Sequence, residues 1–117
     1  MSEGDRYQSL QLASQDIVPQ KAPGSPETGL DGWSYMMRTP EKNFALLYFE
    51  NQSVIPELVG FKSSTLYSIQ WFSPAHGKWK KKNFIKTDKE GKFVLSKFPD
   101  GQNPSVIDWT AKIVENL

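Results

Sequence analysis

The chain has 117 residues, which is enough for one domain built around a single core. Its 14 basic and 13 acidic side chains nearly cancel, so no basic field points to nucleic acid or an anionic membrane as a partner. The absence of cysteine excludes disulfides, thiolate metal sites and a cysteine nucleophile.

Residues 1–30 differ in composition from the rest of the chain. Tyr7, Leu10, Ala13 and Ile17 stand at helical spacing, which predicts a short helix. The stretch PQKAPGSPETGLDG that follows is rich in proline and glycine, which stop regular structure, so we interpret it as a linker. Disorder of the whole segment is the alternative. The first residues also lack the apolar core of a signal peptide.

From residue 31 to 117 the pattern changes to short strands separated by turns. Residues 65–72 alternate well and place Tyr67, Ile69 and Trp71 on one face. Residues 106–114 place Trp109, Ala111 and Ile113 on one face. Pro56 indicates that the run SVIPELVG is an edge strand or contains a bulge. The stretch WFSPAHGKW is expected to be a strand, a tight turn and a return strand, with Trp71 packed inward.

These elements predict an all-β domain, an antiparallel β-sandwich of about seven or eight short strands. A small closed barrel is the alternative architecture. No apolar run approaches the roughly 18 residues that a membrane-spanning helix needs.

The run FALLYFE at 44–50 is apolar on both faces, whereas a sandwich strand normally has one wet face. Phe44, Leu46 and Tyr48 share one of these faces. We therefore expect these three side chains to pack against a covering element. Residues 1–30 are one candidate for that cover, and a neighbouring domain is the other.

No constellation of catalytic residues stands out in the sequence. The single histidine, His76, cannot form a metal cluster by itself, and there is no glycine-rich phosphate loop or nucleophile elbow. The acidic residues fall mostly in turns or at strand ends, and nothing selects a pair for glycoside hydrolysis. We therefore predict no catalytic residue, no metal and no cofactor.

Tryptophan rings could stack on the apolar faces of sugars. Trp71 and Trp109 lie in the middle of strands, so we assign them to the core. Trp33 and Trp79 lie near strand ends and are the candidates for carbohydrate binding, with His76 as a hydrogen-bonding neighbour. The lysine run from Lys78 to Lys82 could grip an anionic ligand, although lysines also protect a solvated edge strand from aggregation.

Four segments in this order resemble one β-sandwich family: GWSYMMR, FALLYF, QWFSPAHGKW and DWTAKIV. The family occurs at the C-terminus of bacterial glycoside hydrolases, after apiosidase-like TIM barrels, and is named a collagen-binding domain of a collagenase. Its central signature is similar to Trp-Phe-Asp-Pro-Arg-x-Gly-x-Trp. Ser73 replaces the acidic residue of that signature and Ala75 the basic one.

The resemblance covers residues 32–117 and implies a non-catalytic accessory domain of a secreted or periplasmic carbohydrate-degrading enzyme. Its expected partner is the catalytic TIM-barrel domain of the parent chain, which it would stabilise by packing against it. Binding of a polysaccharide, or of collagen, is the alternative that the resemblance leaves open.

Overall fold

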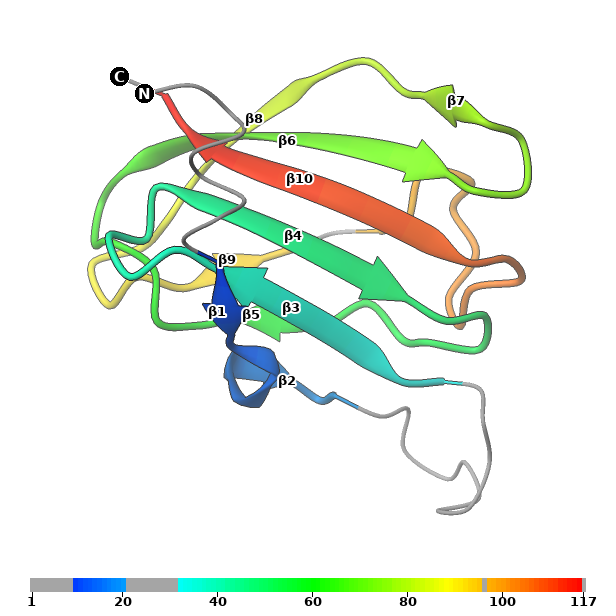
Figure 1. Cartoon of the computed structure of the whole chain (residues 1–117), viewed down its shortest axis with the longest axis horizontal. Helices are drawn as coiled ribbons and strands as arrows, with labels where there is room; N and C mark the ends of the chain where they lie inside the picture. Colours follow the sequence, from blue (N-terminus) through cyan, green and yellow to red (C-terminus); the bar gives the residue numbers. More distant parts are fainter. Residues whose placement is uncertain (1–9, 21–31, 96, 117) are drawn as a thin grey trace.

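The computed structural model describes residues 10–20, 32–95 and 97–116, and in them two antiparallel sheets pack as a sandwich. Sheet A has the strand order β1-β3-β4-β10-β6-β7, with β8 also paired to β6, and sheet B has the order β2-β5-β9. Figure 1 shows β5 and β9 behind the large sheet. The predicted all-β sandwich is thereby confirmed. The strands are β1 (Gln11–Leu12), β2 (Ile17–Val18), β3 (Ser34–Arg38), β4 (Phe44–Phe49), β5 (Glu57–Leu58), β6 (Leu66–Ser73), β7 (Lys78–Trp79), β8 (Asn83–Lys86), β9 (Phe93–Val94) and β10 (Trp109–Glu115).

The last strand of the chain, β10, lies in the middle of sheet A (Figure 1). It pairs with β4 from Trp109↔Phe49 to Val114↔Phe44, and with β6 from Thr110↔Phe72 to Glu115↔Tyr67. Because it bonds to a neighbour on both sides, the sheet is complete only when the C-terminal strand is in place.

The inner face of sheet A carries the core that alternation predicts. Tyr67, Ile69 and Trp71 of β6 are buried, as are the three inward residues of β10. The aromatic rings meet edge-on or tilted, with the Phe49 and Trp71 centroids 5.5 Å apart. Such geometries are the favoured ones for aromatic pairs. The buried residues of sheet B and of the loops that meet this face are Ile17, Leu58, Phe61, Phe93, Leu95 and Phe98.

Two turns depend on a glycine with positive φ. Gly91 has a φ of +79°, and a Cβ there would lie 2.0 Å from the carbonyl oxygen of Phe61, so only glycine fits. Gly77, at φ +66°, ends the tight turn between β6 and β7, and Trp71 of β6 is buried in the core. The stretch WFSPAHGKW is therefore the predicted strand, turn and return strand.

The helix predicted near the N-terminus is wrong for the residues that the structure describes. Residues 11–18 form β1, a three-residue 3-10 turn (Ser14–Asp16) and β2. Ala13 and Ile17, two of the residues at helical spacing, are both buried. The segment nevertheless forms no helix, because it passes from the edge of sheet A to the edge of sheet B. Tertiary pairing with β3 and β5 replaces the local helical bonds. Tyr7 and residues 21–31 of the proposed linker lie outside the described residues.

Pro56 does not place its strand at an edge, contrary to the sequence-based expectation. Strand β5 begins at Glu57, directly after the proline, and lies between β2 and β9 in sheet B. Because the proline precedes the strand, its missing N–H removes no bond from the ladder.

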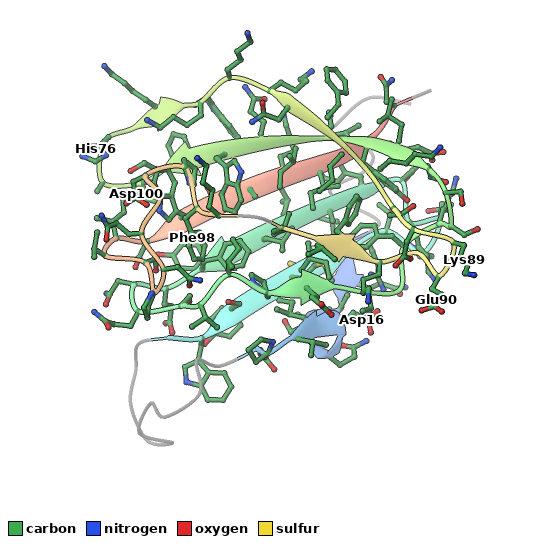
Figure 2. The ribbon with its side chains drawn as sticks, turned by 180° about the vertical axis from the view of Figure 1, so that it is seen from behind. Asp16, His76, Lys89, Glu90, Phe98 and Asp100 are labelled. Carbon is green, nitrogen blue, oxygen red and sulfur yellow. The ribbon has the colours of Figure 1, made fainter. Side chains whose placement is uncertain are left out.

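Arg38 anchors the N-terminal segment to the inner side of the sandwich. Its Nη2 lies 2.6 Å from Asp16 Oδ2, its Nη1 donates to the carbonyl of Val59, and its guanidinium lies 4.9 Å from the Phe61 ring centroid. Figure 2 shows Asp16 at the margin of the sandwich where this contact forms. The buried guanidinium therefore has a carboxylate partner, donates a hydrogen bond to a carbonyl and lies over an aromatic ring. These contacts offset the cost of burying its charge.

Candidate functional site

The outer face of sheet A carries a straight row of side chains across five strands. The register pairs Tyr35 with Tyr48, Tyr48 with Thr110, Thr110 with Phe72, and Phe72 with Trp79. We call these five residues the transverse row. With about 4.8 Å between neighbouring strands, the row spans about 19 Å. Its two ends and its second residue are exposed, since Tyr35, Trp79 and Tyr48 are 44%, 52% and 36% exposed. Thr110 in the middle and Phe72 are half-buried.

A second set of apolar side chains lies beside the row on β3 and β4. Met37 is 39% exposed, and its register partner Leu46 is half-buried. Together with part of the row they line an apolar depression of about 420 Å³. Its lining includes Tyr35, Met37, Leu46, Tyr48, Trp79 and Thr110.

The three residues predicted to pack against a covering element differ in exposure. Tyr48 is exposed and Leu46 half-buried, but Phe44 is fully buried within the chain. The outer face of β4 is therefore closed at its N-terminal end and open toward its C-terminal end.

Carboxylates lie near the tyrosine end of the transverse row. The Tyr48 hydroxyl donates to Asp108 Oδ2, and Asp108 Oδ1 accepts the Asn51 N–H at 2.8 Å. The hydrogen bond to Asp108, together with burial and the negative charges of Asp108 and Glu50, raises the pKa of Tyr48 to about 12. Burial and the charge of Glu50 also raise the pKa of Tyr35. This end therefore presents protonated hydroxyls beside hydrogen-bond acceptors.

The other end of the row is an aromatic pair with a cation beside it. The centroids of Phe72 and Trp79 are 5.0 Å apart, with 44° between the ring planes. Lys112 Nζ lies 5.1 Å from the Trp79 centroid, within the range of a cation–π contact. The Trp79 ring thus packs against Phe72 and Lys112, and its side chain is still more than half exposed.

The other two candidates for carbohydrate binding, Trp33 and His76, are not among the residues that line the depression together with Trp79. Trp33 precedes β3, and three strands separate β3 from β7 in sheet A. Its N–H is accepted by Glu50 Oε1 at 3.2 Å, and its carbonyl accepts the Ser53 hydroxyl. His76 lies at one end of the molecule, in the turn between β6 and β7 (Figure 2).

His76 forms a contact with a serine, but the geometry is that of a turn. His76 Nδ1 lies 2.9 Å from Ser73 Oγ, and Ser73 is almost fully buried. The Ser73 carbonyl accepts the N–H groups of His76 and Gly77. Because a nucleophilic hydroxyl must be accessible to its substrate, this pair closes the turn and is not an active site.

Asp88 and Glu115 make structural contacts. Asp88 caps a turn by accepting the N–H groups of Glu90 and Lys92, and these bonds lower its pKa. Glu115 pairs with Lys62 at 2.8 Å. Within residues 10–20, 32–95 and 97–116 no three His, Asp or Glu side chains are placed to hold a metal ion. Nor does this part of the chain contain a helix long and apolar enough to cross a membrane.

No family model matches the chain, and neither does any curated protein. Among solved structures, it is similar to part of a chain described as a glycoside hydrolase, with a TM-score of 0.54 and 14% sequence identity. The match covers 92% of this chain and 21% of the other. The likeness is one of fold: this sandwich has a counterpart inside a much longer glycoside hydrolase chain. The more specific family resemblance stays a prediction.

Sequence reasoning missed Thr110 of the transverse row and also its two aromatic members Tyr35 and Phe72. Tyr35 and Phe72 are sequence neighbours of the buried core residues Met36 and Trp71, so in a strand they face the opposite side of the sheet. That alternation was a usable signal for an outward direction. It could not show that the two rings align, because the alignment depends on the register between β3, β4, β10 and β6.

Proposed function

We propose that this domain is a non-catalytic accessory domain of a larger carbohydrate-degrading enzyme. It packs on the catalytic domain of the parent chain, a TIM barrel by the family resemblance, and stabilises it. Such an enzyme would act outside the cytoplasm. The observation that carries the proposal is the apolar outer face of β3 and β4, where Tyr35, Met37 and Tyr48 are exposed.

This face is most continuously apolar over β3 and β4, whereas over β10, β6 and β7 aromatic residues such as Phe72 and Trp79 stand among polar ones. On β10 and β6 the outward residues include Thr110, Lys112 and Gln70, which suit contact with water. On β3 and β4 the outward residues are aromatic or apolar. The difference within one sheet face favours a specific contact over β3 and β4, since large exposed apolar patches in soluble proteins mark interaction sites.

Two further observations support a catalytic domain as the occupant. The similar fold accounts for only 21% of a glycoside hydrolase chain, which leaves most of that chain to other parts. In addition, the carboxylates of Asp16, Asp88 and Glu115 are engaged in ion pairs or a turn. Each 100 Å² of apolar surface covered by the neighbour would contribute about 2.5 kcal/mol before the costs of association.

The test compares the parent enzyme with and without a change to this face. We expect Leu46→Lys combined with Met37→Lys to lower the thermal midpoint of the catalytic domain, because two charges would be buried at the contact. The matched control is Gln70→Lys with Leu66→Lys, which adds the same charge to the outer face of β6, away from the depression. Equal midpoints for both double variants and the unchanged enzyme would contradict the proposal.

Binding of a polysaccharide is the second candidate, and the transverse row is the observation that favours it. Aromatic rings side by side can stack on the apolar faces of successive sugars, and the Tyr48–Asp108 pair offers hydrogen bonds to hydroxyl groups. We expect Trp79→Ala to abolish the fluorescence response to a neutral polysaccharide. Phe84→Ala, which removes an exposed ring away from the row, should leave it unchanged. A panel of neutral polysaccharides that gives no response would remove this candidate.

A further inference from the structure

The side of the sandwich between β8 and β9 contains a groove that the proposed function does not use. Among the described strands, β8 pairs only with β6 and β9 pairs only with β5, so a strand edge borders the groove on each sheet. The hollow has a volume of about 400 Å³. The transverse row lies on the opposite face of sheet A, so the groove is a separate feature.

The floor of the groove is apolar and firmly held. It is formed by Ile69 and Trp71 of β6 and by Phe98 from the loop after β9. Trp71 and Phe98 pack edge to face, with centroids 5.8 Å apart. Figure 2 shows Phe98 on the side of the molecule that carries sheet B. Because these three residues also belong to the core, the floor is formed before any ligand binds.

The walls of the groove are the two strand edges. Phe84 on β8 and Val94 on β9 border the hollow, but their side chains share the outer faces of the two sheets with their register partners Ser68 and Glu57. Ile85, which pairs with the inward Tyr67, turns its half-buried side chain toward the hollow. An apolar floor between two polar strand edges suits a ring with apolar faces and a rim of hydroxyl groups.

The charged residues that line the groove are all lysines. Lys81 and Lys97 line the groove together with the amide of Asn83, and no carboxylate does. Neither lysine forms an ion pair with an acidic residue in the described part of the chain. The lysines of the run line different hollows. Lys80 lines a hollow beside His76, and Lys82 lines another beside Lys112. Lys81 is thus the member of the run that serves this groove.

We propose that the groove binds an acidic sugar, a uronate unit within a polysaccharide chain. The ring would lie over Ile85 and Trp71, its carboxylate would meet Lys81 and Lys97, and its hydroxyls would bond to Asn83 and to the main-chain groups of the two strand edges. Those polar edges favour a hydroxyl-rich ligand over an aliphatic acid. The inference rests on the proposed function only in taking carbohydrate as the ligand class.

The test titrates the full chain with oligogalacturonate by calorimetry and by tryptophan fluorescence, because Trp71 lies in the floor. We expect binding, and a loss of affinity of about tenfold for each of Lys81→Gln and Lys97→Gln. The matched control is Lys89→Gln, which removes the same charge at the far end of the molecule from His76 and leaves the groove untouched (Figure 2). Lys89→Gln should retain full affinity.

Three outcomes would overturn the inference: no binding of oligogalacturonate, an equal loss with Lys89→Gln, or equally tight binding of polyglutamate. The last two would show attraction to charge without recognition of a sugar. None of them bears on docking at β3 and β4 or on the response of Trp79 to neutral polysaccharides. Failure here is therefore distinguishable from failure of the proposed function.

Discussion

The two faces of sheet A are both rich in aromatic residues, yet they are in opposite environments. On the inner face Phe49, Trp71 and Trp109 are buried and in mutual contact. On the outer face Tyr35, Tyr48 and Trp79 stand in a row and keep a third to a half of their surface exposed. The comparison teaches that aromatic content alone does not distinguish a core from a binding surface. The difference lies in what the other sheet covers.

The largest contrast is expected between two neighbours on β4. Phe49→Ala should lower the free energy of unfolding by about 3–5 kcal/mol, since it leaves a cavity against Trp71 and Phe98. Tyr48→Ala, on the opposite face, should cost no more than about 1 kcal/mol. Urea denaturation of both variants checks this. If Phe49→Ala does not fold, Phe49→Leu should still cost about 1 kcal/mol or more. Equal costs for positions 48 and 49 would break the distinction between the faces.

A smaller effect is expected at the charged end of the inner face. Asp16→Asn should cost about 1–3 kcal/mol at neutral pH, because the buried Arg38 loses its ionised partner. Glu57→Gln is the control, since its contact with Lys92 is 3.9 Å long and both side chains are well exposed. We expect it to stay within about 0.5 kcal/mol of the parent protein. A cost for Asp16→Asn as small as that of the control would show that Arg38 needs no carboxylate.

The smallest expected effect concerns the outer face and is a pH dependence. The pKa of Tyr48 is raised from 10.0 to about 12, so its neutral form is favoured by folding. The resulting stabilisation is complete below pH 10 and is lost as the pH rises through 12. In a tyrosinate absorbance titration, Asp108→Asn should bring the pKa of Tyr48 back toward 10.0, and Tyr48→Phe identifies its signal. An unchanged titration in Asp108→Asn would show that the carboxylate is not the cause.

Long strands and their inward residues were predictable from the sequence, whereas short strands were not. The alternation in residues 65–72 and 106–114 identified Tyr67, Ile69, Trp71, Trp109, Ala111 and Ile113 as core, and all are buried. Strands β1, β2, β5 and β9 have two residues each, too few for a period to be read. In the described part of the predicted N-terminal helix, the two-residue strands β1 and β2 left no alternation that could have indicated strands instead of a helix.

The candidate site was only partly predictable. The apolar outer face of β4 was visible in FALLYFE, because six apolar residues in succession leave no polar face. The transverse row and the groove were not visible. Both join residues that are distant in sequence, such as Tyr35 with Trp79 and Lys81 with Lys97, and no local pattern encodes such a meeting.

The sequence alone determined that this protein is an all-β domain with a core rich in aromatic residues, because alternation, turns and composition act over a few residues at a time. Only the tertiary structure decided that β10 lies between β4 and β6, which aligns the outer rings into one row. It also decided that sheet B, with its two-residue strands, leaves the side between β8 and β9 open. The physical reason is that register and sheet order arise from contacts between distant segments, whereas strand formation follows from neighbouring residues.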